Sequence, residues 1–303
     1  MRVGTAMRPR ILASRMIDYE GRRWLDVILR VRGSVLPRLL PRALFGGGIG
    51  GVAAWAFAEH GTKLAPIAHT MIGVALGLLL VFRTNASYDR YWEGRRLLGA
   101  VVIRVRDLVR QAAGWAPGEA HLSARQRVRD LACAYFRAVS QTLRGEDDDG
   151  SLAALLPEDA RADILASSAR PQAVMAQLTR SIDALRRSAG LSDTQQLAMD
   201  QNLTAMTDAL AGCERILRTP VPFAYAQHIK LFVVLFCYTA PFTMSEAMGW
   251  YTPLAATLLC IALFGVDEIG VEIEDPFGRD ANDLPLDAMA SGLEKTTAAV
   301  VSA

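Results

Sequence analysis

Few side chains in this sequence stand at spacings that could support catalysis. The residues that could bind a metal or act as nucleophiles are four histidines and four cysteines, His60, His69, His121, His228, Cys133, Cys213, Cys237 and Cys260. The histidines do not pair at the spacing of metal ligands, and no CxxC motif occurs. The P-loop, HExxH and GxSxG patterns are also absent. We therefore expect a protein that is not an enzyme.

Two further patterns resemble ligand sites but have simpler interpretations. Residues 46–51 read GGGIGG and match GxGxxG, yet no strand precedes them and they lie inside an apolar run. Close packing of helices through small residues explains them better. The acidic stretch 146–149 lacks the spaced ligands and distal glutamate of an EF-hand, so we expect a solvated loop.

The most informative spacing is apolar. Val74, Leu78 and Phe82 recur every four residues, so on a helix they share one face, with Gly73 and Gly77 beside it. We call these three residues the apolar stripe. In a single subunit such a stripe would face lipid or another helix. In a symmetric ring it would form stacked apolar collars, which can gate a pore by dewetting.

Four apolar runs in two close pairs would position this stripe. They cover residues 43–58, 64–82, 231–244 and 251–266. The chain is 51% hydrophobic and 21% charged, which suits a few membrane spans joined to a water-exposed part. The alternative is a pair of buried helical hairpins in a soluble protein. The net charge of +2 indicates no particular partner, and we expect no nucleic-acid binding.

Charges beside the runs predict the topology. Arginines are dense before the first run and follow the second, whereas the link between them carries only Lys63. The positive-inside rule then places both termini in the cytoplasm of a multi-pass protein of the inner (plasma) membrane. The expected division is 1–42 (cytoplasmic), 43–82 (spans 1 and 2), 83–228 (cytoplasmic helices), 229–266 (spans 3 and 4) and 267–303 (cytoplasmic).

Residues 83–228 read as helices throughout. Pro171 suits a helix start and Gly190 the end of the same helix. Ser192 to Gln195 form a capping-box pattern for a helix that should run to about Leu217. The sequence thus predicts an all-α protein.

Two long motifs carry a family resemblance. Residues 82–96 read FRTNASYDRYWEGRR and residues 268–287 read EIGVEIEDPFGRDANDLPLD, and both resemble hallmark segments of bacterial bestrophins. Arg32-Gly-Ser34 and the PVPFAY of residues 220–225 match shorter family motifs in the same order. The resemblance covers nearly the whole chain.

This resemblance implies a homopentameric ion channel in the lipid bilayer, with four transmembrane helices per subunit, a helical cytoplasmic body and a central pore. The family's hydrophobic neck falls on Val74, Leu78 and Phe82, the stripe that spacing had already identified. The family also has a cytoplasmic aperture, which maps to Ile216 or Thr219.

Calcium is the one cofactor that the resemblance raises. Two carboxylates of the animal calcium site match Asp280 and Asp283, and its backbone carbonyls would fall near Ile17, Glu272 and Asp275. Arg279 replaces an acid there and adds an opposing charge. We therefore expect that no cofactor is required and that Asp280 and Asp283 cap or tether the chain.

Ion preference is left open by the apolar stripe, because uncharged side chains do not select by sign. The motifs resemble those of bacterial members of the family, which can prefer monovalent cations. The resemblance therefore slightly favours monovalent cations over chloride. Exposed candidates for selecting charges are Glu59, Glu246, Asp267 and Glu268. The alternatives are an anion (chloride) channel of the same fold and a non-conducting membrane scaffold.

Overall fold

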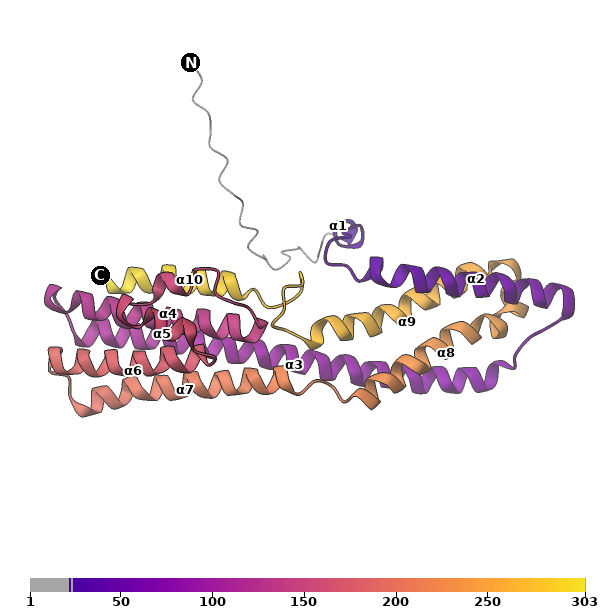
Figure 1. Ribbon diagram of the computed structural model, residues 1–303. Helices are drawn as coiled ribbons and strands as arrows, with labels where there is room; N and C mark the ends of the chain where they lie inside the picture. Colours follow the sequence, from indigo (N-terminus) through magenta and orange to yellow (C-terminus); the bar gives the residue numbers. More distant parts are fainter. Residues whose placement is uncertain (1–21, 23, 303) are drawn as a thin grey trace, which may run out of the picture. The chain divides into compact units, whose positions relative to one another are not determined.

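A computed structural model describes residues 22 and 24–302, and every regular element within them is helical (Figure 1). The α-helices are α1 (Trp24–Ile28), α2 (Leu36–His60), α3 (Pro66–Trp115), α4 (Leu122–Arg144), α5 (Glu158–Ala166), α6 (Arg170–Ala189), α7 (Asp193–Arg218), α8 (Phe223–Met248), α9 (Thr252–Glu274) and α10 (Leu286–Val301). Short 3-10 turns are η1 (Glu119–His121), η2 (Ala153–Leu155) and η3 (Gly249–Tyr251). The expected all-α class is confirmed.

Contacts divide the chain into two compact units. One, the apolar-helix unit, comprises the described residues up to 96 together with 214–276; the other, the helical body, comprises 97–213 and 277–302. These divisions differ from the five sequence segments, because α3 continues unbroken past residue 82. The expected boundaries between membrane spans and cytoplasmic segments stay predictions.

All four apolar runs form helices. Helices α2 and α8 extend beyond their runs at both ends, whereas α3 and α9 begin one or two residues inside theirs and extend beyond them only at the C-terminal end. Two stretches are long and apolar enough to cross a membrane by length and composition, Pro66–Trp115 and Phe223–Glu274. The second contains α8 and α9, which are separated by η3. Helix α2 has 25 residues, about 37 Å of helix, but its glycines and terminal charges lower its hydropathy. The four-span topology therefore stays a prediction.

Glycines allow α2 to approach α9 closely in the apolar-helix unit. A Cβ on Gly50 would lie 2.9 Å from the Cα of Pro253, and one on Gly47 would lie 3.3 Å from the Pro253 carbonyl oxygen. A Cβ on Gly46 would collide with the sulfur of Cys260. The GGGIGG run is thus a helix-packing surface, as expected, and not a nucleotide loop.

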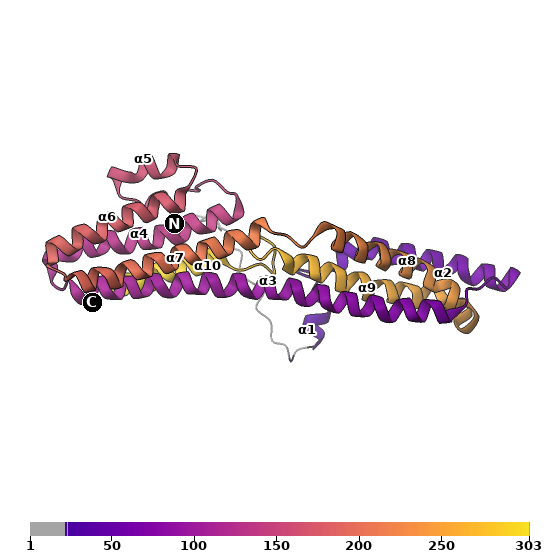
Figure 2. The same cartoon turned by 90° about the horizontal axis from the view of Figure 1, so that it is seen from below.

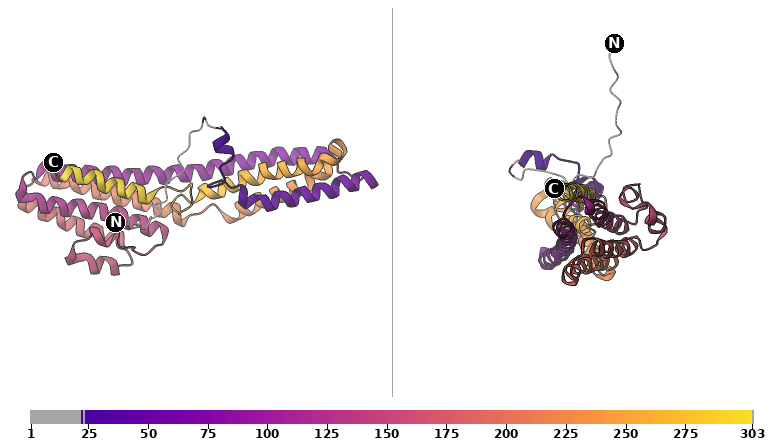
Figure 3. Two further views of the ribbon diagram at one scale, coloured as in Figure 1. Left: turned by 90° about the horizontal axis from the view of Figure 1, so that it is seen from above. Right: turned by 90° about the vertical axis from the view of Figure 1, so that its left-hand side faces the viewer.

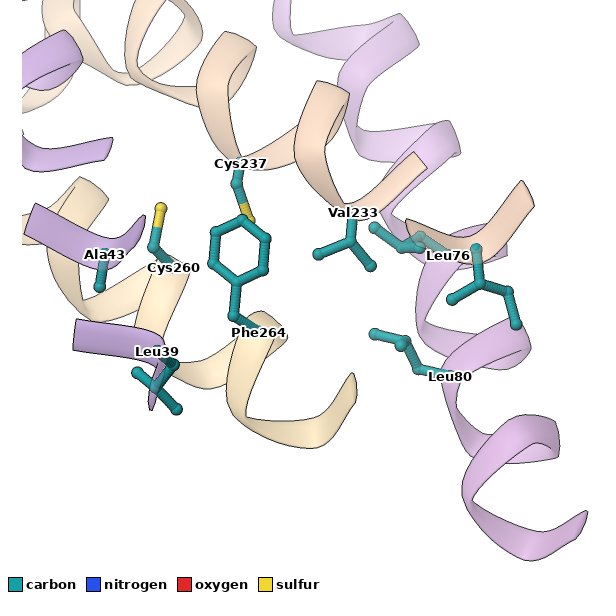
Figure 4. Packing of buried hydrophobic residues seen from close by; sticks show 9 residues of the cluster. Leu39, Ala43, Leu76, Leu80, Val233, Cys237, Cys260 and Phe264 are labelled. Carbon is teal, nitrogen blue, oxygen red and sulfur yellow. The ribbon is translucent and has the colours of Figure 1, made fainter. Parts of the chain in front are cut away.

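The core of this unit brings all four of its long helices together. Figure 4 shows Leu76 and Leu80 of α3 beside Val233 of α8, with the Phe264 ring of α9 directed toward Cys237. Leu39 and Ala43 of α2 complete this buried cluster. Burial of these side chains fixes which face of α3 turns inward.

The helical body is built around α4, which packs against α6 and α10, with α5 on the outer side of α6 (Figures 2 and 3). Pro171 lies in the first turn of α6, and Gly190 ends that helix in the left-handed conformation. Ser192 and Gln195 bond reciprocally, the Gln195 amide to Ser192 Oγ at 3.3 Å and the Ser192 amide to Gln195 Oε1 at 2.9 Å. These three sequence predictions are confirmed.

Candidate pore-lining face

The apolar stripe lies on the outward face of α3. Val74, Leu78 and Phe82 are 73%, 56% and 56% exposed, although all three are large and apolar. At about 100° per residue, they lie roughly opposite a buried line of the same helix. That buried line comprises Leu76, Leu80, Arg83 and Ser87. Among the described residues, the core of the apolar-helix unit therefore leaves the stripe largely uncovered.

An ion cluster one residue beyond Phe82 holds this orientation of α3. Arg83 is 2% exposed and forms an ion pair with Asp267 of α9, which is 4% exposed. Lys230 of α8 completes the cluster, its Nζ 2.9 Å from the second Asp267 oxygen. Because Arg83 is thus tied to Asp267 of α9, Phe82, about 100° around the helix, is turned away from that contact. The sequence analysis did not predict this role of Arg83. The feature that could have indicated it is a charged residue directly after an apolar run.

The two glycines beside the stripe have different surroundings. A Cβ on Gly73 would lie 3.0 Å from the ring of Phe236, so this glycine lets α8 approach α3. Gly77 has open space where a Cβ would lie. A close approach between helices is therefore present within the subunit at Gly73. At Gly77 the structure leaves room for a neighbour.

The turn between α7 and α8 is organised by Arg90. Its guanidinium donates hydrogen bonds to the carbonyl oxygens of Ile216 at 2.8 Å and Thr219, and its Nε donates to the Glu274 carbonyl at 3.2 Å. The Ile216 side chain is 4% exposed and packs inward, whereas Thr219 is exposed. Of the two aperture candidates, only Thr219 presents its side chain at the surface.

Most of the carboxylates proposed to select ions are paired within the subunit. Asp267 is buried with Arg83, Glu268 lies 3.5 Å from Arg42, and Glu246 lies 2.7 Å from Lys63. Glu59 is exposed near the end of α2. Three of the four charges are thus balanced by a cation of the same subunit, which weakens them as sources of a pore potential.

Asp280 and Asp283 form a compact turn. The Asp280 amide donates to Asp283 Oδ2 at 2.6 Å, and the Asp283 amide donates to the Asp280 carbonyl at 3.1 Å. Asp283 is 7% exposed and faces Gly278, where a Cβ would lie 2.6 Å from the same oxygen. This geometry is that of a backbone cap. Of the three carbonyl candidates, Ile17 lies outside the described residues.

Arginines occupy the surroundings of that turn. Arg279 pairs with both carboxylate oxygens of Glu146 and lies 3.6 Å from Asp287. The hydrogen bonds to Glu146 raise the pKa of Arg279 above its ordinary value. Arg144 donates to the Phe277 and Gly278 carbonyls at 3.2 and 3.3 Å and to Asp287. Within the part of the chain that the structure describes, no three His, Cys, Asp or Glu side chains converge as metal ligands. The Asp283 carboxylate and the Phe277 and Gly278 carbonyls thus already accept hydrogen bonds from the protein, and the expectation that calcium is not required stays a prediction.

In the acidic loop at 146–149, the Asp148 carboxylate binds backbone amides that follow it in the chain. Asp148 accepts hydrogen bonds from the Leu152 and Ala153 amides at 2.9 and 3.0 Å and from Gln141 Nε2 at 2.9 Å. Burial acts to raise the pKa of Asp148, but these bonds outweigh it and the pKa is lowered. Asp148 thereby caps the turn η2.

Comparisons with known proteins agree over nearly the whole chain. A family model described as bacterial/fungal bestrophin protein matches residues 16–299. A voltage-dependent anion channel-forming protein of Nostoc is 35% identical, with 90% of each chain covered. A voltage-dependent anion channel-forming protein of Ralstonia nicotianae is 37% identical, and the match covers 89% of this chain and 90% of that protein. A solved bacterial bestrophin homologue from Klebsiella pneumoniae has a TM-score of 0.81 at 32% identity, covering 89% of this chain and all of that one.

Proposed function

Because the chain belongs to the bacterial and fungal bestrophin family, we propose that it forms a membrane ion channel whose pore is lined by the apolar stripe of α3. The observation that carries this proposal is the exposure of Val74, Leu78 and Phe82 opposite the buried face of the same helix. Three large apolar side chains in line on an outward face need a nonaqueous or narrow surrounding. Copies of the subunit arranged around an axis supply one.

The proposed assembly is a ring of identical subunits, five by family resemblance. In it, α2, the first part of α3, α8 and α9 cross the inner (plasma) membrane, and the helical body and both termini lie in the cytoplasm. The arginine-rich start of the chain supports this orientation. Gly77, with open space beside it, would let neighbouring α3 helices come close.

We propose that the permeant ions are anions. The preference for monovalent cations that the sequence slightly favoured has no support among the relatives, which are named as anion channel-forming proteins. Chloride is the simplest such ion. Permeation down a gradient needs neither a cofactor nor calcium, and no step of it involves Asp280 or Asp283.

The stripe itself would act as a gate. Successive collars of Val74, Leu78 and Phe82 offer a permeating ion no hydrogen-bonding group for about 12 Å of helix rise. An ion that enters must keep its water shell, so a small narrowing empties the neck of water and stops the current. A wider or more polar neck should conduct more readily.

The test is chloride flux from vesicles reconstituted with the protein. We expect the triple variant Val74→Ala, Leu78→Ala, Phe82→Ala to conduct at least about tenfold faster than the parent, because a dewetting barrier is removed. A matched control replaces Leu231, Val234 and Leu235, exposed apolar residues of α8, with alanine. It removes comparable apolar volume and should leave the flux unchanged.

Two outcomes would count against the proposal. Equal effects of the two triple variants would show that α3 is not the pore wall. An absence of flux in the parent and in both variants, with intact oligomers, would favour a non-conducting membrane scaffold.

A further inference from the structure

The outward face of α3 does not end at Phe82. Continued at the same helical spacing, it carries Asn85, Asp89, Trp92 and Arg96. All four side chains are exposed, and Trp92 is 58% exposed. We call these four residues the polar extension of the apolar stripe. Every one of them belongs to the apolar-helix unit.

Other charged residues between 83 and 96 are already engaged within this unit. Arg83 is buried with Asp267, and Arg90 is bound to backbone carbonyls. Glu93 pairs with Arg215 at 2.6 Å. The structure's described residues give no hydrogen bond or ion pair to the three remaining charges, which are Asp89, Arg95 and Arg96.

Of these three charges, two share the face of the stripe. Asp89 and Arg96 follow Phe82 by seven and fourteen residues, so they return to nearly the same angle around the helix. Arg95 is turned about 100° away from Arg96. Among the described residues from 83 to 96, two unpaired charges of opposite sign therefore face where Phe82 faces, and a third does not.

We propose that Asp89 and Arg96 set the ion preference of the pore, as two charged rings of opposite sign beyond the apolar neck. This inference rests on the proposed function, since each subunit of the ring would add one of each charge. Arg96, about 21 Å of helix rise beyond Phe82, would concentrate anions on the approach to the neck, and Asp89, which lies between Arg96 and Phe82, would oppose it. The preference is then the balance between the rings, while the stripe supplies only the gate.

The spacing of the two rings allows each to act on its own. They lie about 10 Å apart along the helix, close to the Debye length at physiological salt. Multiplied around a ring and bounded by low-dielectric protein, such charges change local ion concentrations about tenfold or more. Screening also predicts that the preference weakens as ionic strength rises.

The experiment is a reversal-potential measurement across a potassium chloride gradient in planar bilayers containing the purified full-length protein. Asp89→Asn should raise the chloride-to-potassium permeability ratio, and Arg96→Gln should lower it, each by about tenfold. The double variant should return close to the parent. Arg95→Gln removes the same charge one residue away and off the stripe, so its shift should be much smaller.

Asp89→Asn keeps the shape of its side chain and Arg96→Gln shortens it, but both positions are exposed and have no hydrogen-bond or ion-pair partner among the described residues, so the oligomer should persist, which size-exclusion chromatography checks. Shifts of opposite sign for Asp89→Asn and Arg96→Gln support the proposal. Unchanged reversal potentials in conducting variants would overturn it, as would equal shifts for Arg95→Gln and Arg96→Gln. A parent protein that carries no current would instead refute the proposed channel function.

Discussion

Replacing Asp267 with asparagine removes the single acid of a buried ion cluster while keeping its shape. Asp267 is 4% exposed and neutralises Arg83, which is 2% exposed. The Arg83 Nε is buried and has no hydrogen-bond partner among the described residues, so its guanidinium depends on Asp267. Lys230 also contacts Asp267 but its side chain is 48% exposed, so water can solvate it.

The magnitude follows from this difference in burial. Breaking a buried pair typically costs about 3–5 kcal/mol, because the remaining charge is left uncompensated. For a chain of 303 residues, that corresponds to a fall in Tm of about 5–8 °C. Arg83→Met should cost less, since Asp267 would keep Lys230 as a partner. Arg83→Met with Asp267→Leu should recover much of the loss, because it leaves no buried charge.

The assay is thermal unfolding of the purified oligomer in detergent, followed by tryptophan fluorescence at one fixed scan rate. The matched control is Glu246→Gln. Glu246 pairs with Lys63 at 2.7 Å, but their side chains are 58% and 50% exposed, so its loss should cost less than about 1 kcal/mol. Equal Tm values for Asp267→Asn and Glu246→Gln would refute the reasoning that burial gives the cluster its strength.

Two further predictions concern packing and capping. Gly50→Ala should destabilise the protein by about 1–3 kcal/mol, because its Cβ would meet the backbone of Pro253, whereas Gly48→Ala, with no atom nearby, should be neutral or slightly stabilising in the same melts. A similar loss for both would contradict the close approach of α2 to α9. Asp148→Ala should cost about 1–2 kcal/mol by removing the hydrogen bonds that hold η2, as measured by Tm and by amide exchange at Leu152 and Ala153. Because the pKa of Asp148 is lowered in the fold, its stabilisation is complete above its ordinary value of 3.8 and is lost as pH falls through the lowered pKa, so the gap between parent and variant should close in acid. A gap that stays constant to pH 2 would show that the carboxylate charge is not involved.

Local patterns predicted the helices and their ends well. The capping box at Ser192, the left-handed end at Gly190 and the apolar runs depend on residues within a few positions of each other, so periodicity and capping rules reach them. The same holds for the apolar stripe. Its three residues lie on one helix, and their common face follows from helical geometry alone. That they lie on the outward side required knowing what buries the opposite face.

Charge pairing was beyond any local pattern. Arg83 and Asp267 are 184 residues apart, and so are Arg90 and the Glu274 carbonyl that it binds. The sequence offered Asp267, Glu268 and Glu246 as selecting charges, but the fold gives each a cation of its own. It also buries Ile216 and turns Asp283 onto the Asp280 amide.

The amino-acid sequence therefore determined the helices, the family and the line of Val74, Leu78 and Phe82, all of which rest on short-range spacing or on motifs. Only the tertiary structure decided which charges stay unpaired, because that depends on which helices meet. Electrostatic potential is a sum over neighbouring charges, and the ion pairs named above, such as Arg83 with Asp267, join residues that are distant in sequence. Asp89 and Arg96 are the two charges on the outward face of α3, between residues 83 and 96, to which the packing of the described residues gives no ion-pair partner.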